Sequence, residues 1–183
     1  ANSLKTPISD SNFPVFLKPD HKLNVADVES GLQSYYQQTA LDPYTSQNPK
    51  SEYRPISVFR TQQSHVLQLR DKLPAPIANV TYLDLGMTAL SMYVPFYQGA
   101  KIPAYYQIGS ESADDTSAFW KFRKLQTLAL QKFPKYAPIV QTGFAQLNQQ
   151  LAKEQVDFEK QYVKIYAKNP AQAQQLLDKF TTD

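Results

Sequence analysis

The fold is decided by residues 54–85, which read RPISVFRTQQSHVLQLRDKLPAPIANVTYLDL. Within this stretch, three short runs are rich in the β-branched and aromatic residues that favour strands: residues 54–61, 64–70 and 77–85. Only Gln62 and Gln63 separate the first two runs. We therefore expect a tight hairpin there, although this pair lacks the Gly or Asn that such turns prefer. Prolines and a glycine bound the third run.

The next stretch, residues 91–97, reads SMYVPFY and is predicted as a fourth strand or a loop. Its internal Pro95 cannot donate a ladder hydrogen bond, so it belongs at a sheet edge or in irregular structure. Residues 54–99 thus form a predicted sheet region of three or four antiparallel strands, and not a complete barrel.

A helix is predicted before the sheet region, over residues 24–39. Asn24 is a good N-cap, and Asp27 follows three residues later to interact with the helix start. Residues 1–23 contain three prolines and are predicted to be an extended N-terminal segment. Its apolar residues are expected to dock on another surface: Phe13, Val15, Phe16 and Leu17.

Residues 112–181 are predicted to be helical. Ser112 and Thr116 are alternative N-caps for a helix that continues to Pro134, and Pro138 lies where the next helix is expected to begin. Apolar residues then recur at spacings of three, four and seven up to Ile165, which predicts one packed helix of about seven turns. The dipeptide at residues 169–170, Asn-Pro, ends this helix and precedes a last short one. Strands followed by helices indicate an α+β fold.

The composition is that of one globular domain. The chain has 183 residues, 42% hydrophobic and 13% aromatic, which is enough for a real core. The net charge of +3 is not concentrated in a basic cluster, so we expect neither a nucleic acid nor a membrane as partner. The sequence contains no Cys, which excludes disulfides and a cysteine nucleophile within these residues.

The side chains suggest no metal site and no cofactor. The two histidines, His21 and His65, are far apart in sequence, and no HExxH or glycine-rich phosphate loop is present. Ser64 and His65 are neighbours on a predicted strand and point to opposite faces, so they do not suit a nucleophile and its base. Asp114 and Asp115 are expected at a helix N-terminus, where negative charge is favourable.

One aromatic cluster has two interpretations. Tyr93, Phe96, Tyr97, Tyr105 and Tyr106 lie with prolines and a glycine in a stretch that leaves little room for regular structure. Rigid aromatic side chains on a loop often line a pocket for a small ligand. Equally, they can plug the loop into the core.

The order of several motifs resembles one family. The series YRPISVFRTQQSHVLQLR, PIANVTYLDLG, SMYVPFYQG and DDTSAFWKFRKL resembles the C-terminal part of the C69 dipeptidases, N-terminal-nucleophile hydrolases best known from lactic acid bacteria. The resemblance covers about residues 54–125. Each motif alone is weak, and their order makes the resemblance fairly specific.

The resemblance implies an αββα architecture and hydrolysis of dipeptides with a free N-terminus. It also implies a cysteine nucleophile at the mature N-terminus, with its own α-amino group as the base. This chain starts at Ala1 and lacks Cys, so we expect it to be inactive alone and interpret it as the C-terminal part of a longer dipeptidase. A degenerate relative is the less favoured interpretation.

The expected partners follow from that interpretation: the upstream N-terminal half of the same polypeptide and a dipeptide substrate. A homo-oligomer is left open, and the absence of targeting signals suggests the cytoplasm. The alternative function is a non-catalytic ligand-binding or assembly module that uses the aromatic cluster and the long helix. A ligand-binding protein of another family is the third hypothesis.

No catalytic residue is assigned within the chain, but four residues are candidates for substrate binding: Arg54, Asn79, Tyr93 and Tyr97. An Asn side chain can donate to an oxyanion, and Arg can hold a substrate carboxylate by two hydrogen bonds. The alternative roles are structural: Asn79 would satisfy backbone groups at a strand edge, and Arg54 would pair with Glu52.

Overall fold

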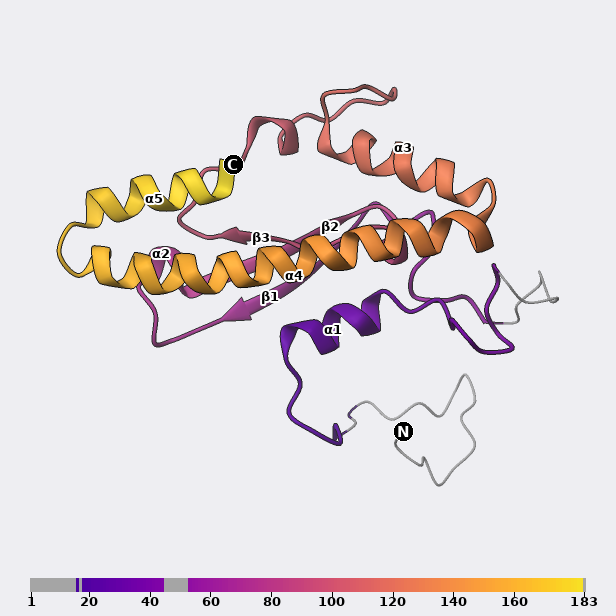
Figure 1. Cartoon of the computed structure of the whole chain (residues 1–183), viewed down its shortest axis with the longest axis horizontal. Coiled ribbons are helices and arrows are strands. Elements are labelled where there is room, and N and C mark those ends of the chain that lie inside the picture. Colours follow the sequence, from indigo (N-terminus) through magenta and orange to yellow (C-terminus); the bar gives the residue numbers. More distant parts are fainter. Residues whose placement is uncertain (1–15, 17, 45–52, 183) are drawn as a thin grey trace.

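The protein is described by a computed structural model that covers residues 16, 18–44 and 53–182. It is a mixed α+β structure, as the sequence predicts, with a small antiparallel sheet and one long helix (Figure 1). The order of its elements is α1 (Val25–Leu32), β1 (Gln63–Leu69), α2 (Ala75–Ala78), β2 (Asn79–Leu85), η1 (Thr88–Leu90), β3 (Val94–Tyr97), η2 (Ala104–Tyr106), α3 (Ala118–Leu130), α4 (Phe133–Tyr166) and α5 (Pro170–Thr182).

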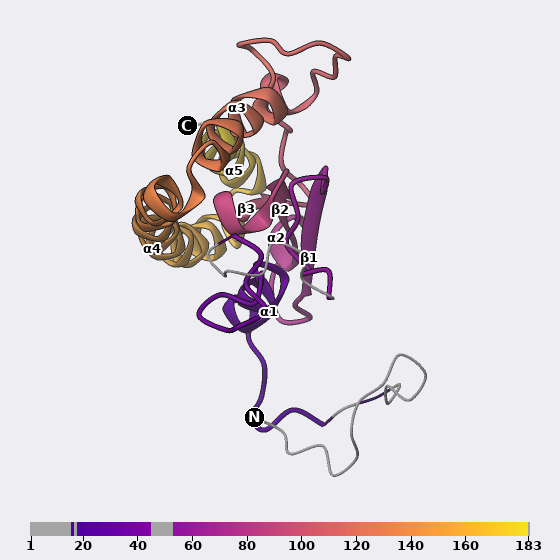
Figure 2. The same ribbon diagram turned by 90° about the vertical axis from the view of Figure 1, so that its right-hand side faces the viewer.

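The sheet has the strand order β1-β2-β3, and both pairs are antiparallel. Directly opposed residues share a face of a sheet. Val66 pairs with Tyr82, and Val80 pairs with Tyr97, so these side chains lie on one face, which we name the helix-side face. The helices α3, α4 and α5 gather on one side of the strands, and β1 lies at the far edge (Figure 2).

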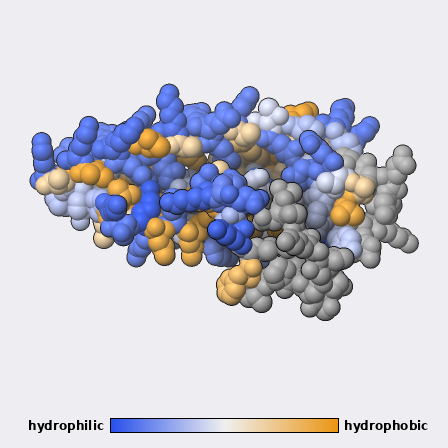
Figure 3. Space-filling view, turned by 90° about the horizontal axis from the view of Figure 1, so that it is seen from below, coloured by the Kyte–Doolittle hydropathy of each residue, from blue (hydrophilic) through white to orange (hydrophobic). Residues whose placement is uncertain are grey.

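The opposite face, which we name the open face, carries exposed leucines. Leu67 is 62% exposed and Leu69 is 77% exposed, although both are in β1. In the view from below, the described surface is largely hydrophilic, and its apolar residues form separated groups (Figure 3).

Two strand predictions are confirmed, and one is wrong. The runs at 64–70 and 77–85 form β1 and β2, apart from the short helix α2 at the start of the second run. Residues 54–61 form bends and a turn, so the predicted hairpin at Gln62 and Gln63 does not exist. The buried Ser57 explains the difference: its N–H donates to the Ser34 carbonyl at 2.9 Å, and its hydroxyl oxygen accepts from the Ala89 N–H at 2.8 Å. These contacts hold the segment against the loop after α1 and against η1, in place of strand pairing.

The stretch at 91–97 contains strand β3, which is an edge of the described sheet. Pro95 is tolerated there, as predicted, because an edge strand needs ladder hydrogen bonds on one side only. The expectation that this aromatic stretch has little regular structure is therefore wrong for Val94–Tyr97.

The first helix is shorter than predicted. Asn24 and Asp27 form the expected cap, in which each side chain accepts a hydrogen bond from the other's backbone N–H. The helix ends at Leu32 and not at Thr39, since Tyr36 and Gln38 adopt left-handed φ values of 62° and 61°. This turn brings Tyr35 against the ring of Phe133, with centroids 5.4 Å apart.

The extended N-terminal segment is described only in part. Residues 18–23 have no helix or strand, in agreement with the prediction. Phe16 is 90% exposed, so the expected docking is wrong for that residue. The other three apolar residues of the predicted docking patch lie outside the described residues: Phe13, Val15 and Leu17.

The C-terminal helices are confirmed, with different boundaries. The N-cap of α3 is Ser117, and neither Ser112 nor Thr116, because Asp114 already accepts hydrogen bonds from the N–H groups of Thr116 and Ser117. The long helix α4 has 34 residues, about nine turns, and contains Pro138 in its interior. Among the described residues, no helix combines the length and apolar character needed to cross a membrane.

Two clusters of buried side chains form the core. The first lies between the sheet, α4 and α5, and contains Ile77, Val80, Tyr97, Phe158, Tyr162, Ala173 and Leu177. The second lies between η1, α3 and the start of α4, and contains Met87, Ala89, Leu90, Ala129, Phe133 and Ala137. Both clusters involve α4, which therefore holds the two ends of the molecule together.

Candidate functional site

Two of the predicted binding residues, Asn79 and Arg54, lie in different elements of the fold. Asn79 begins β2, and its amide donates to the Gln98 side-chain oxygen at 2.6 Å. Arg54 is exposed in the segment before β1, and its carbonyl oxygen accepts from the Tyr36 hydroxyl at 3.4 Å. Glu52, the alternative partner of Arg54, lies outside the described residues. The Asn79 amide thus bonds to a side chain, and not to the backbone groups that its structural alternative predicts.

The other two predicted residues, Tyr93 and Tyr97, are both 2% exposed, and their hydroxyls have different partners. The Tyr93 hydroxyl lies 2.8 Å from the hydroxyl oxygen of Ser64, and burial raises the pKa of Tyr93 to about 12. The Tyr97 hydroxyl donates to Glu159 at 2.6 Å, within the first core cluster. Burial, followed by this carboxylate, raises the pKa of Tyr97 well above its usual range.

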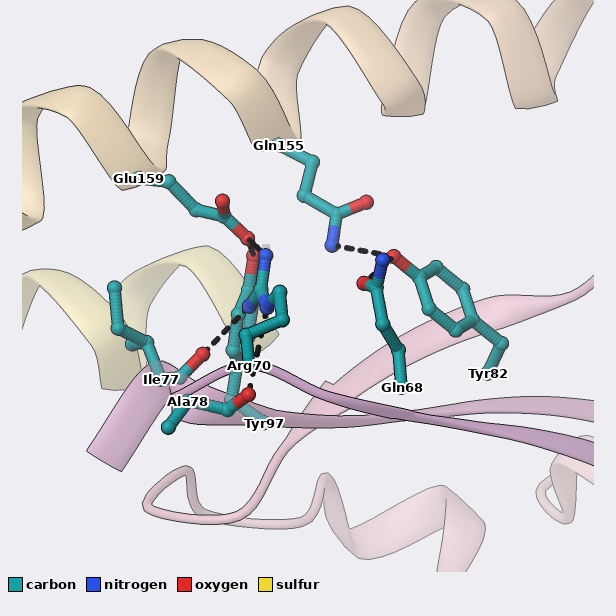
Figure 4. Close-up of polar contacts among 8 residues, drawn as sticks. All are labelled: Gln68, Arg70, Ile77, Ala78, Tyr82, Tyr97, Gln155 and Glu159. Atoms are coloured by element: carbon teal, nitrogen blue, oxygen red, sulfur yellow. Dashed lines mark hydrogen bonds and ion pairs between the residues drawn. The ribbon is translucent and has the colours of Figure 1, made fainter. Parts of the chain in front are cut away.

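Glu159 also accepts from Arg70, so α4 is tied to the sheet through one ionic group (Figure 4). The Arg70 Nη1 lies 2.7 Å from the Glu159 Oε1, and its Nη2 donates to the carbonyl oxygen of Ile77 at 2.6 Å. The two charged side chains are only about one-fifth exposed, at 20% and 18%. Since each guanidinium nitrogen of Arg70 donates to a protein acceptor, this group positions α4 on the strands.

A second polar group lies beside it and fixes the ring of Tyr82 (Figure 4). The Gln155 amide of α4 donates to the Tyr82 hydroxyl at 3.1 Å, and that hydroxyl donates to the Gln68 side-chain oxygen at 3.2 Å. The ring of Tyr82 is thus held between β1 and α4.

Tyr82 and Tyr93 line a cleft of about 450 Å³ between α1 and α4, which we name the α1–α4 cleft. Its walls are small or apolar residues of the two helices, together with amide side chains. They include Val25, Ala145, Asn148, Leu151, Ala152 and Gln155. Helix α1 contributes one acidic side chain, Glu29, whose pKa is raised to about 7 by burial. The volume is within the range of small-molecule sites in proteins.

A second buried acid, Asp84, lies on the helix-side face beside Ser64, with which it pairs across β1 and β2. It is fully buried, and among the described residues neither of its carboxylate oxygens has a hydrogen-bond partner. Burial raises the pKa of Asp84 to about 8, and the negative charge of Glu29 acts in the same direction. Burial therefore favours the protonated form of Asp84.

The arrangement can bind a small molecule, but it does not assemble an acyl-transfer site. Ser64 pairs with Tyr93, whereas His65 pairs across the strands with Leu83, so serine and histidine point to opposite faces, as expected. In residues 16, 18–44 and 53–182, no group of three or more potential metal ligands is found.

Sequence reasoning missed Glu29 and Asp84. Alternation along β2 places Asp84 on the same face as Val80 and Tyr82, so an acid at an inward position was a detectable signal. Glu29 carries no such signal, because its burial depends on the packing of α1 against the sheet, whose strands are distant from α1 in sequence. Of the four predicted residues, the structure places one, Tyr93, at the cleft.

Comparison with known proteins identifies relatives of this chain. A family model described as Peptidase family C69 matches residues 2–145. A "Probable dipeptidase" from Salmonella dublin is 54% identical over 99 residues, and a "Probable dipeptidase A" from Streptococcus pyogenes serotype M18 is 31% identical over 182 residues. A "Probable dipeptidase B" from Lactococcus lactis is 32% identical over 126 residues.

These alignments cover most of this chain but a minor part of each relative. They include 54%, 91% and 65% of the chain for the three relatives, respectively. The same alignments span 22%, 39% and 27% of the relatives' own lengths.

Proposed function

The chain belongs to peptidase family C69, and we propose on that premise that it forms part of a dipeptidase that hydrolyses the peptide bond of dipeptides. The observation that carries the proposal is the family match over residues 2–145. The three relatives are all named as probable dipeptidases, which supports the same activity.

In this proposal the nucleophile comes from a different stretch of a longer polypeptide. The family resemblance implies a cysteine nucleophile, and these 183 residues contain none. The relatives are more than twice as long as the aligned region, which leaves room for such a stretch. This chain would then contribute a surface that binds substrate, and its sheet and helices would hold that surface in place. The acyl-transfer chemistry would take place at the cysteine.

The open face of the sheet is where we place the rest of that polypeptide. Leu67 and Leu69 are 62% and 77% exposed on a strand, an arrangement that favours cover by another apolar layer. The part of the longer polypeptide that corresponds to the unaligned length of the relatives would supply that cover. An αββα arrangement, a homo-oligomer and a cytoplasmic location stay predictions from the sequence.

The four residues predicted to bind substrate differ in how well their positions suit that role. Tyr93 lines the α1–α4 cleft and is the strongest candidate for a substrate contact. Tyr97 acts through Glu159, as a positioning residue. Asn79 and Arg54 would contact substrate only if the remainder of the polypeptide closes over them.

The test compares this chain with the longer polypeptide that contains it. Both are incubated with a panel of unblocked dipeptides, and released amino acids are measured by chromatography. We expect no turnover by residues 1–183 alone, turnover by the longer polypeptide, and loss of that turnover when its N-terminal nucleophilic cysteine is replaced by alanine.

Two outcomes would contradict the proposal. The first is turnover by residues 1–183 that survives repurification and disappears after a single Ser or Thr substitution. The second is a longer polypeptide that folds but hydrolyses no dipeptide, which would favour the non-catalytic binding module.

A further inference from the structure

The α1–α4 cleft contains a carboxylate without a basic neighbour in its lining. Among the described residues that line the cleft, there is no Lys, Arg or His. Glu29 takes part in none of the ion pairs found in the described residues: His21–Asp27, Arg70–Glu159, Lys101–Asp178, Lys124–Asp115 and Lys160–Asp157. A half-buried carboxylate gains most from a ligand that brings its own positive charge.

The tyrosine hydroxyls in the cleft are already engaged. Tyr82 accepts from Gln155 and donates to Gln68, and Tyr93 is paired with Ser64. Neither hydroxyl is therefore available as the main donor for an anionic ligand. The polar groups that remain along the helices are the side chains of Ser30, Gln33, Asn148 and Gln149, which can accept or donate hydrogen bonds, so the charge preference of the cleft rests on Glu29.

The size of the cleft and the residues of its walls further limit which kinds of ligand fit. A volume of about 450 Å³ suits a molecule of amino-acid or dipeptide size. Pro95, Ala145, Leu151 and Ala152 provide apolar contacts for a short side chain. A divalent metal ion is a poorer match, since such ions take six or more oxygen ligands and Glu29 is the cleft's only carboxylate among the described lining residues.

We propose that the α1–α4 cleft binds a small organic ammonium ion, with Glu29 as its counter-ion and the apolar walls around its carbon chain. The amino group of an amino acid or a peptide has this chemistry. The inference concerns equilibrium binding and does not depend on peptidase activity, so its failure and the failure of the proposed function are separable.

The test uses 3-methylbutylamine as the probe, and 3-methyl-1-butanol as the neutral molecule of the same shape. The amine stays protonated below pH 9, as a lysine side chain does with its pKa of about 10.4. Binding is followed by NMR on the isotopically labelled 183-residue chain at pH 7.5. We expect saturable shifts of backbone amides in α1 and α4 with the amine and not with the alcohol.

The key variant is Glu29→Gln, which keeps the shape of the side chain and removes its charge. Loss of a charge-assisted hydrogen bond should weaken amine binding by roughly ten- to a hundredfold. The matched control is Glu111→Gln, which changes the same charge on an exposed residue outside the cleft lining. A second variant, Ala152→Phe, fills the cleft but retains Glu29, and should also abolish binding.

The pH dependence provides an independent readout. Glu29 must lose its proton to hold the ammonium ion, so affinity should rise between pH 5.5 and its pKa of about 7 and then change less steeply. The titratable groups that face it are Tyr82, Tyr93 and Asp84, and of these Asp84 ionises near pH 8. The described lining residues of α4 include no titratable side chain. Glu29→Gln should abolish the rise below pH 7.

Three results would overturn the proposal. One is equal binding by Glu29→Gln and the unchanged chain, and another is equal binding of amine and alcohol. The third is an absence of saturable shifts in α1 and α4 up to a probe concentration of about 50 mM, far above the millimolar affinity expected of so small a ligand. Magnesium chloride run in parallel should give no saturable shifts at these residues, and saturation by magnesium would identify a metal site instead.

Discussion

The hydroxyl of Tyr97 donates a hydrogen bond of 2.6 Å to Glu159, which lies 62 residues later in the chain. The same carboxylate oxygen accepts from Arg70 at 2.7 Å. Strand β3, the end of β1 and helix α4 thus meet at a single oxygen atom. The position of the long helix on the sheet depends on that meeting point.

Removing the Tyr97 hydroxyl should lower stability even though the ring stays in place and no large cavity forms. We expect Tyr97→Phe to reduce the free energy of unfolding by about 1.5–3 kcal/mol, the range for a hydrogen bond to a charged group. Tyr97→Ala should cost about 3–5 kcal/mol, because it also removes a large core ring. Urea denaturation measures both. The control Tyr136→Phe, at a residue 37% exposed, should change stability by less than about 0.5 kcal/mol.

Removing one charge of the Arg70–Glu159 ion pair should lower the free energy of unfolding more than removing both charges. Arg70→Met leaves Glu159 with less compensation at 18% exposure, and we expect a loss of about 3 kcal/mol. The double variant Arg70→Met/Glu159→Gln should recover most of that loss, since both charges are then gone and an amide oxygen remains to accept from the Tyr97 hydroxyl. A double-mutant cycle by urea denaturation checks this, and simple additivity of the two single variants would contradict it.

Asp84 should make the protein less stable as pH rises. Its pKa in the folded state is about 8, above the ordinary value of 3.8, so the folded protein binds the extra proton between these limits. Stability should therefore fall with rising pH across this window, by up to about 1.4 kcal/mol per pH unit from this group. Asp84→Asn should remove this slope and exceed the unchanged chain in stability at pH 8.

The control for Asp84 is Asp157→Asn on exposed helix surface, which should leave the pH slope unchanged. The raised pKa of Glu29 also makes stability fall as pH rises. Because Glu29 is present in both variants, its contribution cancels in the comparison. Thermal denaturation from pH 5 to pH 8.5 provides the measurement. Parallel curves for Asp84→Asn and the unchanged chain would refute the assignment.

Gly86 should not tolerate a side chain. It has a φ of 84°, and a Cβ atom there would overlap the Gln126 amide. That amide donates to the Leu85 carbonyl at 2.8 Å and accepts from the Met87 N–H at 3.0 Å, so it holds the turn after β2. Gly86→Ala should cost about 1–3 kcal/mol. Gly143→Ala, in α4 with open space around its Cα, should instead be neutral or stabilising.

The open face should govern association. Leu67→Gln with Leu69→Gln should leave unfolding nearly unchanged, since both side chains are largely exposed. The same double change should reduce self-association of the chain, or its binding to the rest of the longer polypeptide, as measured by light scattering and pull-down. A strictly monomeric unchanged chain that binds no such partner would count against the proposed cover of this face.

Local signals in the sequence predicted much of the fold. The cap at Asn24 and the β-rich runs of β1 and β2 depend on neighbouring residues, and they were predicted correctly. The strand expected at 54–61 was wrong because Ser57 pairs with Ser34 and Ala89, which are distant in sequence. Likewise, α4 passes through Pro138, because packing along its length outweighs one missing hydrogen bond.

The candidate site was less predictable for the same reason. Tyr93 was found through its aromatic neighbours, whereas the burial of Glu29 results from the packing of α1 against a sheet whose strands come later in the chain. The partner of Tyr97 could not be read from the sequence, because Glu159 is one of several acids on α4 and only the docking angle selects it.

The late position of α4 and α5 in the chain has a consequence for protein synthesis. Strands β1 to β3 leave the ribosome before these helices, but Val80 and Tyr97 are covered by Phe158, Tyr162 and Leu177. At usual elongation rates, the roughly 80 residues from Tyr97 to Leu177 take about 4–16 s to be made. During that interval the nascent sheet presents apolar side chains and unpaired edges, so chaperone binding competes with aggregation until the last helix emerges.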